Sequence, residues 1–159
     1  ITAARAFAPY GLYWFEEPTI PDDFVSHFRI QSEGGIPVAA GENLHTIYEF
    51  HHLIEAGGVS FVEPDASNCG GVTGWMRVAR LAYAHNLPTT SHGIHEIHLH
   101  LLAAIPNKSF VEHHGFGLER YMLDPPQMID GVLSAPEKPG HGVEFEWERL
   151  AADNGKSAP

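Results

Sequence analysis

The sequence predicts an α/β fold: the C-terminal part of a TIM-type (β/α) barrel, with parallel strands inside and helices outside. Short apolar segments typical of strands alternate with helical stretches four times, and one more strand-type segment follows. Each strand-type segment is followed by an acidic residue or a histidine. A barrel brings all its strand ends to one mouth, whereas an open sheet places its ligand mainly at one crevice. The repeated ionisable ends therefore favour the barrel.

The length of the chain limits how much of a barrel it can form. A complete (β/α)8 barrel needs about 250 residues, and this chain has 159. We therefore expect the first part of the barrel to be missing from this chain. An open α/β sheet of unrelated function stays as the alternative. It predicts that the Glu16 and Glu42 carboxylates lie more than about 8 Å apart, too far to share one octahedral ion.

The strands are predicted from runs of apolar residues that end in polar or Pro-containing turns. Because side chains alternate along a strand, residues two apart share a face. The expected strands are residues 12–15, 37–40, 59–62, 87–90 and 110–111. The ionisable side chains that follow them are Glu16, Glu42, Asp65, His92 and Glu112. We expect these five side chains to point from the same rim of the sheet.

The helices are predicted from apolar periodicity and from residues that begin or end helices. Residues 1–10 read as the end of a helix that Pro9 and Gly11 stop. Asp22 or Asp23 is placed to cap the helix at 22–32, which Gly34-Gly35 ends, and Gly57-Gly58 closes the helix at 46–56. The expected helices are residues 22–32, 46–56, 73–85 and 96–104.

The domain organisation follows from where this alternation stops. Residues 1–120 are expected to form the partial barrel. Residues 121–150 are rich in Pro and Gly, include an expected last strand at 142–147, and are expected to return toward a missing capping domain. Residues 151–159 carry few large apolar side chains and are expected to be a disordered tail.

Composition narrows the classes of function and partner. Nine Lys and Arg against twenty Asp and Glu give a net charge of −11, which argues against nucleic acid and anionic membranes as partners. Cys69 is the only cysteine, so no disulfide framework forms and a reducing compartment is the simplest setting. No apolar run approaches the roughly 20 residues of a membrane span, and no signal peptide is visible. We expect a cytoplasmic protein.

Glu16 and Glu42 are the expected metal ligands. Mg²⁺ is usually held by a few carboxylates, with water and substrate completing the octahedron. Two carboxylates at the ends of adjacent parallel strands suit that geometry. The alternative is that each is a solvated acid at a strand end.

Asp65 and His92 are expected to form an acid–base pair. A carboxylate on one ring nitrogen fixes the tautomer and favours the protonated ring, which leaves the other nitrogen as a general base or acid near neutral pH. Glu112 is expected to act on an oxygen where charge develops. Its alternative is an ion pair with His113 or His114.

Other histidines are assigned from their positions along the chain. His45 follows Glu42 by three residues, and His95 follows His92 by three, so both are expected to contact substrate at the rim. His98 is expected on a helix surface. Cys69 has no activating partner in the sequence and is expected to be a packing residue.

The strand-end motifs resemble a known family. Trp-Phe-Glu-Glu-Pro, Gly-Glu-Asn, Pro-Asp-Ala, Gly-Gly-Val-Thr-Gly-Trp, Ser-His-Gly and Val-Glu occur in order, and their ionisable residues are spaced by 26, 23, 27 and 20 residues. This pattern resembles the mandelate racemase branch of the enolase superfamily, the mandelate racemase and muconate lactonizing enzyme family. The resemblance covers roughly residues 10–150, the C-terminal barrel portion of such an enzyme.

The resemblance implies roles for the five strand-end residues. Glu16 and Glu42 become two of three Mg²⁺ ligands. Asp65 and His92 become the acid–base pair, and Glu112 lies near the substrate carboxylate. The implied reaction is Mg²⁺-dependent removal of the proton α to a carboxylate through an enediolate.

The resemblance also implies a substrate class. Most similar enzymes act on sugar acids, so the expected protein is a lyase of carbohydrate acid catabolism that dehydrates an aldonate or aldarate. Return of the proton to the opposite face would instead give a racemase or epimerase of a 2-hydroxy acid. The expected partner is this small acid, and the full-length form is expected to be a homo-oligomer.

The sequence departs from the family pattern in three ways. The third metal ligand, an Asp one strand before Glu16, is absent, and so are a Lys-x-Lys base and the N-terminal capping domain. We therefore expect weak Mg²⁺ affinity and little activity from the isolated chain. A truncated, inactive half-barrel that only binds a ligand or a partner chain is the non-enzymatic alternative.

Overall fold

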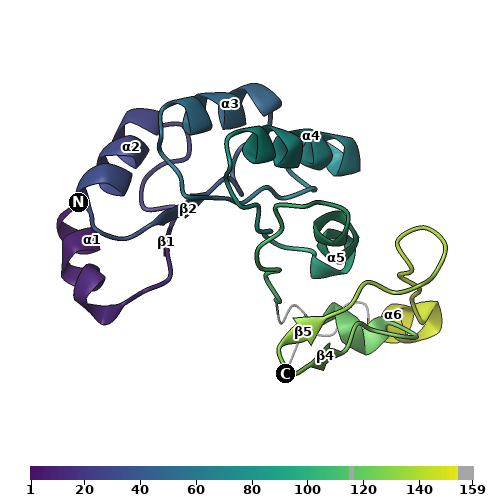
Figure 1. Ribbon diagram of the computed structural model, residues 1–159. Coiled ribbons are helices and arrows are strands. Elements are labelled where there is room, and N and C mark those ends of the chain that lie inside the picture. Colours follow the sequence, from purple (N-terminus) through teal and green to yellow (C-terminus); the bar gives the residue numbers. More distant parts are fainter. Residues whose placement is uncertain (115–116, 154–159) are drawn as a thin grey trace.

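The computed structural model describes residues 1–114 and 117–153, and its N-terminal half is built on a three-stranded parallel sheet (Figure 1). Its strands are β1 (Phe15–Glu16), β2 (Val38–Ala40) and β3 (Phe61–Val62), in the order β1-β2-β3. Phe15 lies opposite Val38, and Ala39 lies opposite Phe61. Sequential parallel neighbours joined by helices are the repeating unit of a barrel wall.

Beyond β3 the parallel pairing continues only through isolated β-bridges, each formed by one residue pair. Thr89 pairs in parallel with Val62 on one side and with Lys108 on the other. The expected strands at 87–90 and 110–111 are therefore wrong as regular strands, and the outer bridge lies at Lys108 instead. Pro88 lacks an N–H group to donate to a neighbouring strand, which limits the ladder there. The order of the parallel segments is nevertheless the predicted one.

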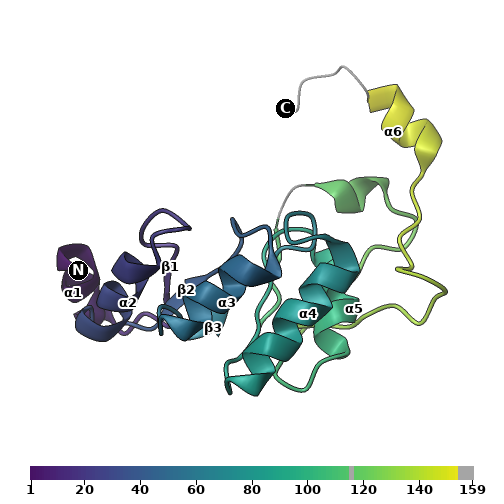
Figure 2. The ribbon, with the colours of Figure 1, turned by 90° about the horizontal axis from the view of Figure 1, so that it is seen from above.

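Helices follow the strands and cover one side of the sheet (Figures 1 and 2). They are α1 (Thr2–Phe7), the short 3₁₀ helix η1 (Ala8–Tyr10), α2 (Phe24–Glu33), α3 (Ile47–Glu55), α4 (Gly71–Ala84) and α5 (His95–Ala103). All five predicted helical stretches are present within a few residues of their expected bounds. In the part of the chain that the structure describes, no helix is long and apolar enough to cross a membrane.

Local hydrogen bonds explain where two of these helices begin. Asp23, and not Asp22, caps α2, because its carboxylate accepts the Ser26 N–H at 3.0 Å. Thr46 and Glu49 form a reciprocal capping box at the start of α3. Such boxes satisfy backbone N–H groups that have no partner within the helix.

The hydrophobic core lies between the sheet and the helices. Val38, Phe50, Val62 and Trp75 are fully buried in it, and the Trp75 indole N–H donates to the Pro64 carbonyl at 2.8 Å. The sheet's other face carries an aromatic cluster with ring centroids 5.1–5.9 Å apart. It consists of Tyr13, Trp14, Phe61 and Phe110. Alternation along β3 places Phe61 and Val62 on these two opposite faces.

The C-terminal segment differs most from expectation. It contains η2 (Leu118–Tyr121), an antiparallel hairpin of β4 (Met128–Ile129) and β5 (Val132–Leu133), and α6 (Trp147–Asp153). The expected strand at 142–147 is wrong: only Phe145 forms a bridge, to Met122, and one residue pair is too short for a strand.

The end of the described chain is helical. Residues 151–153 belong to α6, so the expectation of a disordered tail from residue 151 does not hold for them. The Tyr121 hydroxyl and the Asp153 carboxylate lie 3.4 Å apart, which ties the end of α6 to η2. The rest of the expected tail, 154–159, lies outside the described residues.

Candidate active site

Three carboxylates meet at the C-terminal ends of the three strands. Glu16 ends β1, Glu42 follows β2 and Glu63 follows β3 directly. One oxygen from each lies within 4.8 Å of the others. Glu16 and Glu42 therefore converge as predicted, and the open-sheet alternative, which required a separation of more than about 8 Å, is wrong.

Glu63 is the residue that the sequence analysis missed. Its side chain is buried, with only 2% of the residue exposed, and its Oε2 has no hydrogen-bond partner within the described part of the chain. Burial, followed by the charges of Glu16 and Glu112, raises the pKa of Glu63 to about 9. A signal was present in the sequence, because Glu63 lies two residues after Phe61 and so shares its face.

The donors of this carboxylate cluster fit a hard divalent cation. Mg²⁺ takes carboxylate oxygens in octahedral geometry and keeps several waters. The buried Oε2 of Glu63 has no hydrogen-bond partner among the described residues, and the pKa values of Glu42 and Glu63 are raised even though His92 lies beside Glu42, so the arrangement would accommodate a further positive charge. Burial is the largest cause of both shifts, and neighbouring glutamates add to it.

Glu17 holds the loop that carries Glu42. Its Oε1 accepts the Gly41 N–H at 3.1 Å, and its Oε2 accepts the Asn43 amide at 2.6 Å. Gly41 adopts φ +139°, and a Cβ there would lie 2.7 Å from the Phe50 ring. A glycine is therefore required where the chain turns from β2 toward the cluster.

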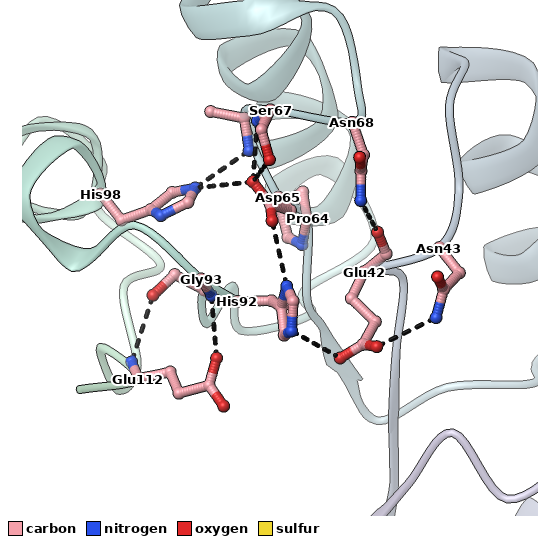
Figure 3. Close-up of polar contacts among 12 residues, drawn as sticks. Glu42, Asn43, Pro64, Asp65, Ser67, Asn68, His92, Gly93, His98 and Glu112 are labelled. Atoms are coloured by element: carbon pink, nitrogen blue, oxygen red, sulfur yellow. Dashed lines mark hydrogen bonds and ion pairs between the residues drawn. The ribbon is translucent and has the colours of Figure 1, made fainter. Parts of the chain in front are cut away.

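His92 connects the carboxylate cluster to Asp65 (Figure 3). Its Nδ1 lies 3.0 Å from Asp65 Oδ2, and its Nε2 lies 3.2 Å from Glu42 Oε2. The predicted contact between Asp65 and His92 is therefore present in the structure. One imidazole ring bridges the acid at the third strand end and a carboxylate of the cluster.

Asp65 is held in an orientation that suits this contact. Its Oδ1 accepts the Ser67 N–H at 2.7 Å and the Ser67 hydroxyl at 2.6 Å, which leaves Oδ2 directed at His92. Gly93 has φ +82°, and a Cβ there would lie 2.7 Å from Asp65 Oδ2. The close approach of the His92–Gly93 backbone to Asp65 therefore requires glycine.

The electrostatics favour an ionised Asp65 and a protonated His92. Burial opposes the charged form of Asp65, but hydrogen bonds from Ser67 and His92 lower its pKa overall. Burial likewise opposes the His92 cation, yet the bond to Asp65 and the charge of Glu42 raise the pKa of His92. An imidazole with a raised pKa can hold or release a proton near neutral pH.

His98 is not on a helix surface, as the sequence analysis expected. It is fully buried, and its Nε2 accepts the Ala66 N–H at 3.0 Å. The same nitrogen lies 3.9 Å from Asp65 Oδ1, and the ring packs near Trp75. His98 is buried because α5 packs against α4 and the loop that carries Asp65. Periodicity along α5 alone could not show these contacts. His98 thus supports the loop that carries Asp65.

Glu112 lies beside Gly93 at the same rim. Its Oε2 accepts the Gly93 N–H at 2.9 Å, and its own N–H donates to the Ser91 hydroxyl at 3.2 Å (Figure 3). The same oxygen lies 2.6 Å from His114 Nε2. The alternative of an ion pair with His114 is therefore present in the geometry, together with the predicted position near His92.

The two expected substrate contacts have different surroundings. His45 is exposed just before α3, and its backbone N–H donates to Glu49. His95 is buried at the start of α5, near His113 and Glu119. Among the described hydrogen bonds and ion pairs, neither residue contacts Glu42 or His92. The packing of Cys69 agrees with expectation, since it is buried and burial raises its thiol pKa to about 11.

Comparison with known proteins identifies the family. The family model described as enolase C-terminal domain-like matches residues 1–149. The chain belongs to this family. The resemblance to the mandelate racemase branch of the enolase superfamily is confirmed, and the C-terminal barrel fold with it.

Relatives within the family include sugar-acid enzymes. The chain is 53% identical to a 3,6-anhydro-alpha-L-galactonate cycloisomerase of Streptomyces coelicolor, over 94% of this chain and 42% of the relative. It is 33% identical to an L-rhamnonate dehydratase of Saccharopolyspora erythraea, over 91% of this chain and 40% of that protein. The chain thus spans about two fifths of the length of the curated relatives it matches.

Solved structures of the family show the same fold. A racemase from Streptomyces coelicolor with bound magnesium matches with a TM-score of 0.90 and 50% identity, over 95% of this chain and 42% of the other. An L-talarate dehydratase from Polaromonas, complexed with Mg and L-glucarate, matches with a TM-score of 0.86 and 32% identity, over 94% and 40%.

Proposed function

We propose that this chain supplies the C-terminal half of the active site of a Mg²⁺-dependent enzyme that removes the proton α to a carboxylate through an enediolate. We further propose that the outcome is dehydration of a sugar acid, an aldonate or aldarate. The observation that carries this proposal is the series of contacts that runs from the carboxylate cluster through Glu42 and His92 to Asp65.

Glu16, Glu42 and Glu63 are the residues that would hold the ion. When bound, Mg²⁺ supplies positive charge that polarises a substrate carboxylate and stabilises the enediolate. Glu17 and Asn43 keep Glu42 in place, since the Asn43 amide donates to both carboxylates. The three ligands come from successive strand ends, so the sheet itself sets their spacing.

His92 is the proposed general base and acid. Asp65 holds its Nδ1, so Nε2 is the nitrogen that faces the carboxylate cluster and any acid bound there. Neutral His92 takes the α proton at Nε2. If the substrate carries a β-hydroxyl, the imidazolium so formed gives that proton to the hydroxyl oxygen, the C–O bond breaks and water leaves. If the substrate has no such leaving group, racemisation needs a proton delivered to the opposite face by an acid from outside this chain, such as the Lys-x-Lys group that the family resemblance implies.

Glu112 is proposed to act on the substrate carboxylate. It lies next to Gly93 and is oriented by the Gly93 N–H and by His114. This position places its carboxyl group beside an oxygen on which charge would develop. His45 stays a proposed substrate contact of the rim, supported by its exposure after Glu42.

The names of the relatives support sugar acids as the substrate class. They include an L-rhamnonate dehydratase, a D-galactonate dehydratase and an L-talarate dehydratase complexed with L-glucarate. A second candidate outcome is isomerisation without loss of water, as a racemase, epimerase or cycloisomerase. The 53% identical relative named as a cycloisomerase favours it.

Deuterium exchange separates these outcomes. The full-length protein that contains this chain is purified and incubated with Mg²⁺ and a panel of aldonates, aldarates and anhydro-sugar acids in D₂O, and products are followed by NMR. Dehydration gives a 2-keto-3-deoxy acid that has lost one water, racemisation or epimerisation returns the acid with deuterium at the α carbon, and cycloisomerisation gives an isomer that has lost no water. If no acid exchanges its α proton, the proposed reaction is wrong and the half-barrel that only binds a ligand or a partner chain is favoured.

We further propose a cytoplasmic homo-oligomer. The single cysteine and the acidic surface charge are compatible with that setting. Size-exclusion chromatography with light scattering tests the oligomeric state, and a monomer would contradict it.

A further inference from the structure

We infer that His95, His113 and Glu119 form a binding site for a borderline-soft divalent metal ion of the Zn²⁺ class. The inference does not depend on the proposed reaction, because none of the three residues belongs to the carboxylate cluster or to the Asp65–His92 pair. The three ligands come from different segments: the first turn of α5, the residue after Glu112, and η2.

The distances between the donor atoms fit a shared ion. His95 Nε2 lies 3.6 Å from Glu119 Oε1, and His113 Nε2 lies 3.9 Å from the same oxygen. One ligand atom from each residue lies within 4.8 Å of the others. Ligands about 2.0–2.2 Å from a tetrahedral Zn²⁺ lie about 3.3–3.6 Å from one another. The two distances to Glu119 therefore need a contraction of at most about 0.6 Å to enclose an ion, and the two imidazole nitrogens, within 4.8 Å of each other, must also move closer.

The buried ring nitrogens of His95 lack hydrogen-bond partners among the described residues, which indicates that they bind something other than the protein. Its side chain is 3% exposed, and neither ring nitrogen has a hydrogen-bond partner within the described part of the chain. Buried polar groups without partners are costly, so they usually bind water, an ion or a ligand. The His95 and His113 rings lie 4.5 Å apart between centroids, with both Nε2 atoms near Glu119. A metal ion would satisfy the buried nitrogen of His95.

The charges at this site also favour a divalent cation. Glu96, which is buried, places its Oε1 3.7 Å from His95 Nε2 and adds a second negative charge beside Glu119. Burial lowers the pKa of His95, which favours the neutral imidazole that binds metals. Two imidazoles and a carboxylate suit zinc and related transition metals, whereas magnesium prefers oxygen ligands alone.

Alternation along residues 112–114 explains why two histidine clusters lie so close together. Glu112 and His114 face His92, and His113 between them faces His95. An ion on His95, His113 and Glu119 would join α5 to the segment that leads into η2. It would also hold His113 next to Glu112, a proposed catalytic residue.

Binding of Co²⁺, a spectroscopic substitute for Zn²⁺, tests the site. The purified metal-free protein is titrated with Co²⁺ in excess Mg²⁺, so that the carboxylate cluster is occupied, and visible absorption reports tetrahedral coordination. We expect one tetrahedral site. His113→Ala and Glu119→Gln should each lower its Co²⁺ affinity by at least about 10-fold, because a change even to an outer-shell partner costs 10–100-fold.

Two control variants separate this site from other histidines. His51→Ala removes an exposed histidine on α3, and His92→Asn disrupts the neighbouring group of His92, Glu112 and His114. Both should retain the tetrahedral Co²⁺ spectrum. His113 is 39% exposed, so its replacement leaves the fold intact, which far-UV circular dichroism checks. The inference is overturned if wild type shows no tetrahedral Co²⁺, or if the signal survives in both His113→Ala and Glu119→Gln.

Discussion

Replacement of Glu63 by Gln tests the electrostatics of the carboxylate cluster. Gln keeps the size and polarity of the side chain but cannot ionise. In the metal-free protein, Glu63 is buried among other glutamates, and these surroundings raise its pKa to about 9 from an ordinary value of 4.5. The substitution should therefore remove a pH-dependent loss of stability and, at the same time, remove a proposed ligand for Mg²⁺.

The size of the effect follows from the two pKa values. In the folded state Glu63 keeps its proton up to about pH 9, whereas in the unfolded state it loses the proton above pH 4.5. The unfolded state thus binds fewer protons between these values, so the free energy of unfolding falls as pH rises through this window. At pH 7 the loss is about 3 kcal/mol. The Glu63→Gln protein should lack this loss.

Urea denaturation at pH 5 and pH 7, with and without Mg²⁺, measures both effects. Without Mg²⁺, wild type should lose about 2.5 kcal/mol more than Glu63→Gln between the two pH values, since the rest of the loss lies below pH 5. With Mg²⁺ at 100 times its Kd, wild type should gain about 2.7 kcal/mol, and the variant should gain much less at the same concentration. Glu55→Gln, which replaces a carboxylate that is 54% exposed, is the matched control and should behave as wild type.

Two results would refute the reasoning on Glu63. Equal pH dependence in wild type and Glu63→Gln would show that Glu63 is ionised in the folded protein. Equal stabilisation by Mg²⁺ would show that Glu63 is not a ligand.

Three further substitutions test the acid–base pair and the fold. His92→Asn should lower turnover by about 10²–10⁴-fold while calorimetric Mg²⁺ binding is retained; normal turnover on every accepted acid would contradict the assigned role. Asp65→Asn should lower the pKa of His92, because the bond to Asp65 favours the protonated ring; the ring's NMR titration checks this, and an unchanged or higher pKa would count against it. Thr46→Ala removes half of the capping box with Glu49 and should lower the free energy of unfolding by about 1 kcal/mol; a loss below 0.3 kcal/mol in urea denaturation would show that the box contributes little.

Local sequence signals were sufficient for most of the framework. The helices at α2 and α3 begin where Asp23 and Thr46 can accept backbone N–H groups, and these contacts involve residues only three apart. The positions of Glu16 and Glu42 followed from strand ends and alternation, which are also local properties. The order of parallel segments followed from the repeated strand-helix pattern.

The errors have a common physical origin. His98 was placed on a surface because its own helix could not show that α4 and the Asp65 loop would cover it. α6 was missed because its end is held by a distant residue, Tyr121. The β4–β5 hairpin is an exception, because its pairing is local: Asp130 and Gly131, both with positive φ, form the turn, and this Asp-Gly signal in the sequence was overlooked. The strands expected at 87–90 and 110–111 are not regular strands, and only single β-bridges form in this region. The length of a strand depends on its pairing with neighbouring strands, which a local pattern does not show.

The amino-acid sequence alone determined which residue types end each strand and where the first helices begin, because these depend on periodicity and short-range hydrogen bonds. Its strand-end motifs also sufficed to indicate the family, through their resemblance to known members. Tertiary structure alone decided that Glu63 joins Glu16 and Glu42, that His92 contacts Glu42 as well as the predicted Asp65, and that His95 lies near His113 and Glu119. Charge and burial act through space, so the pKa of a carboxylate and the partner of an imidazole depend on which strand ends the fold brings together.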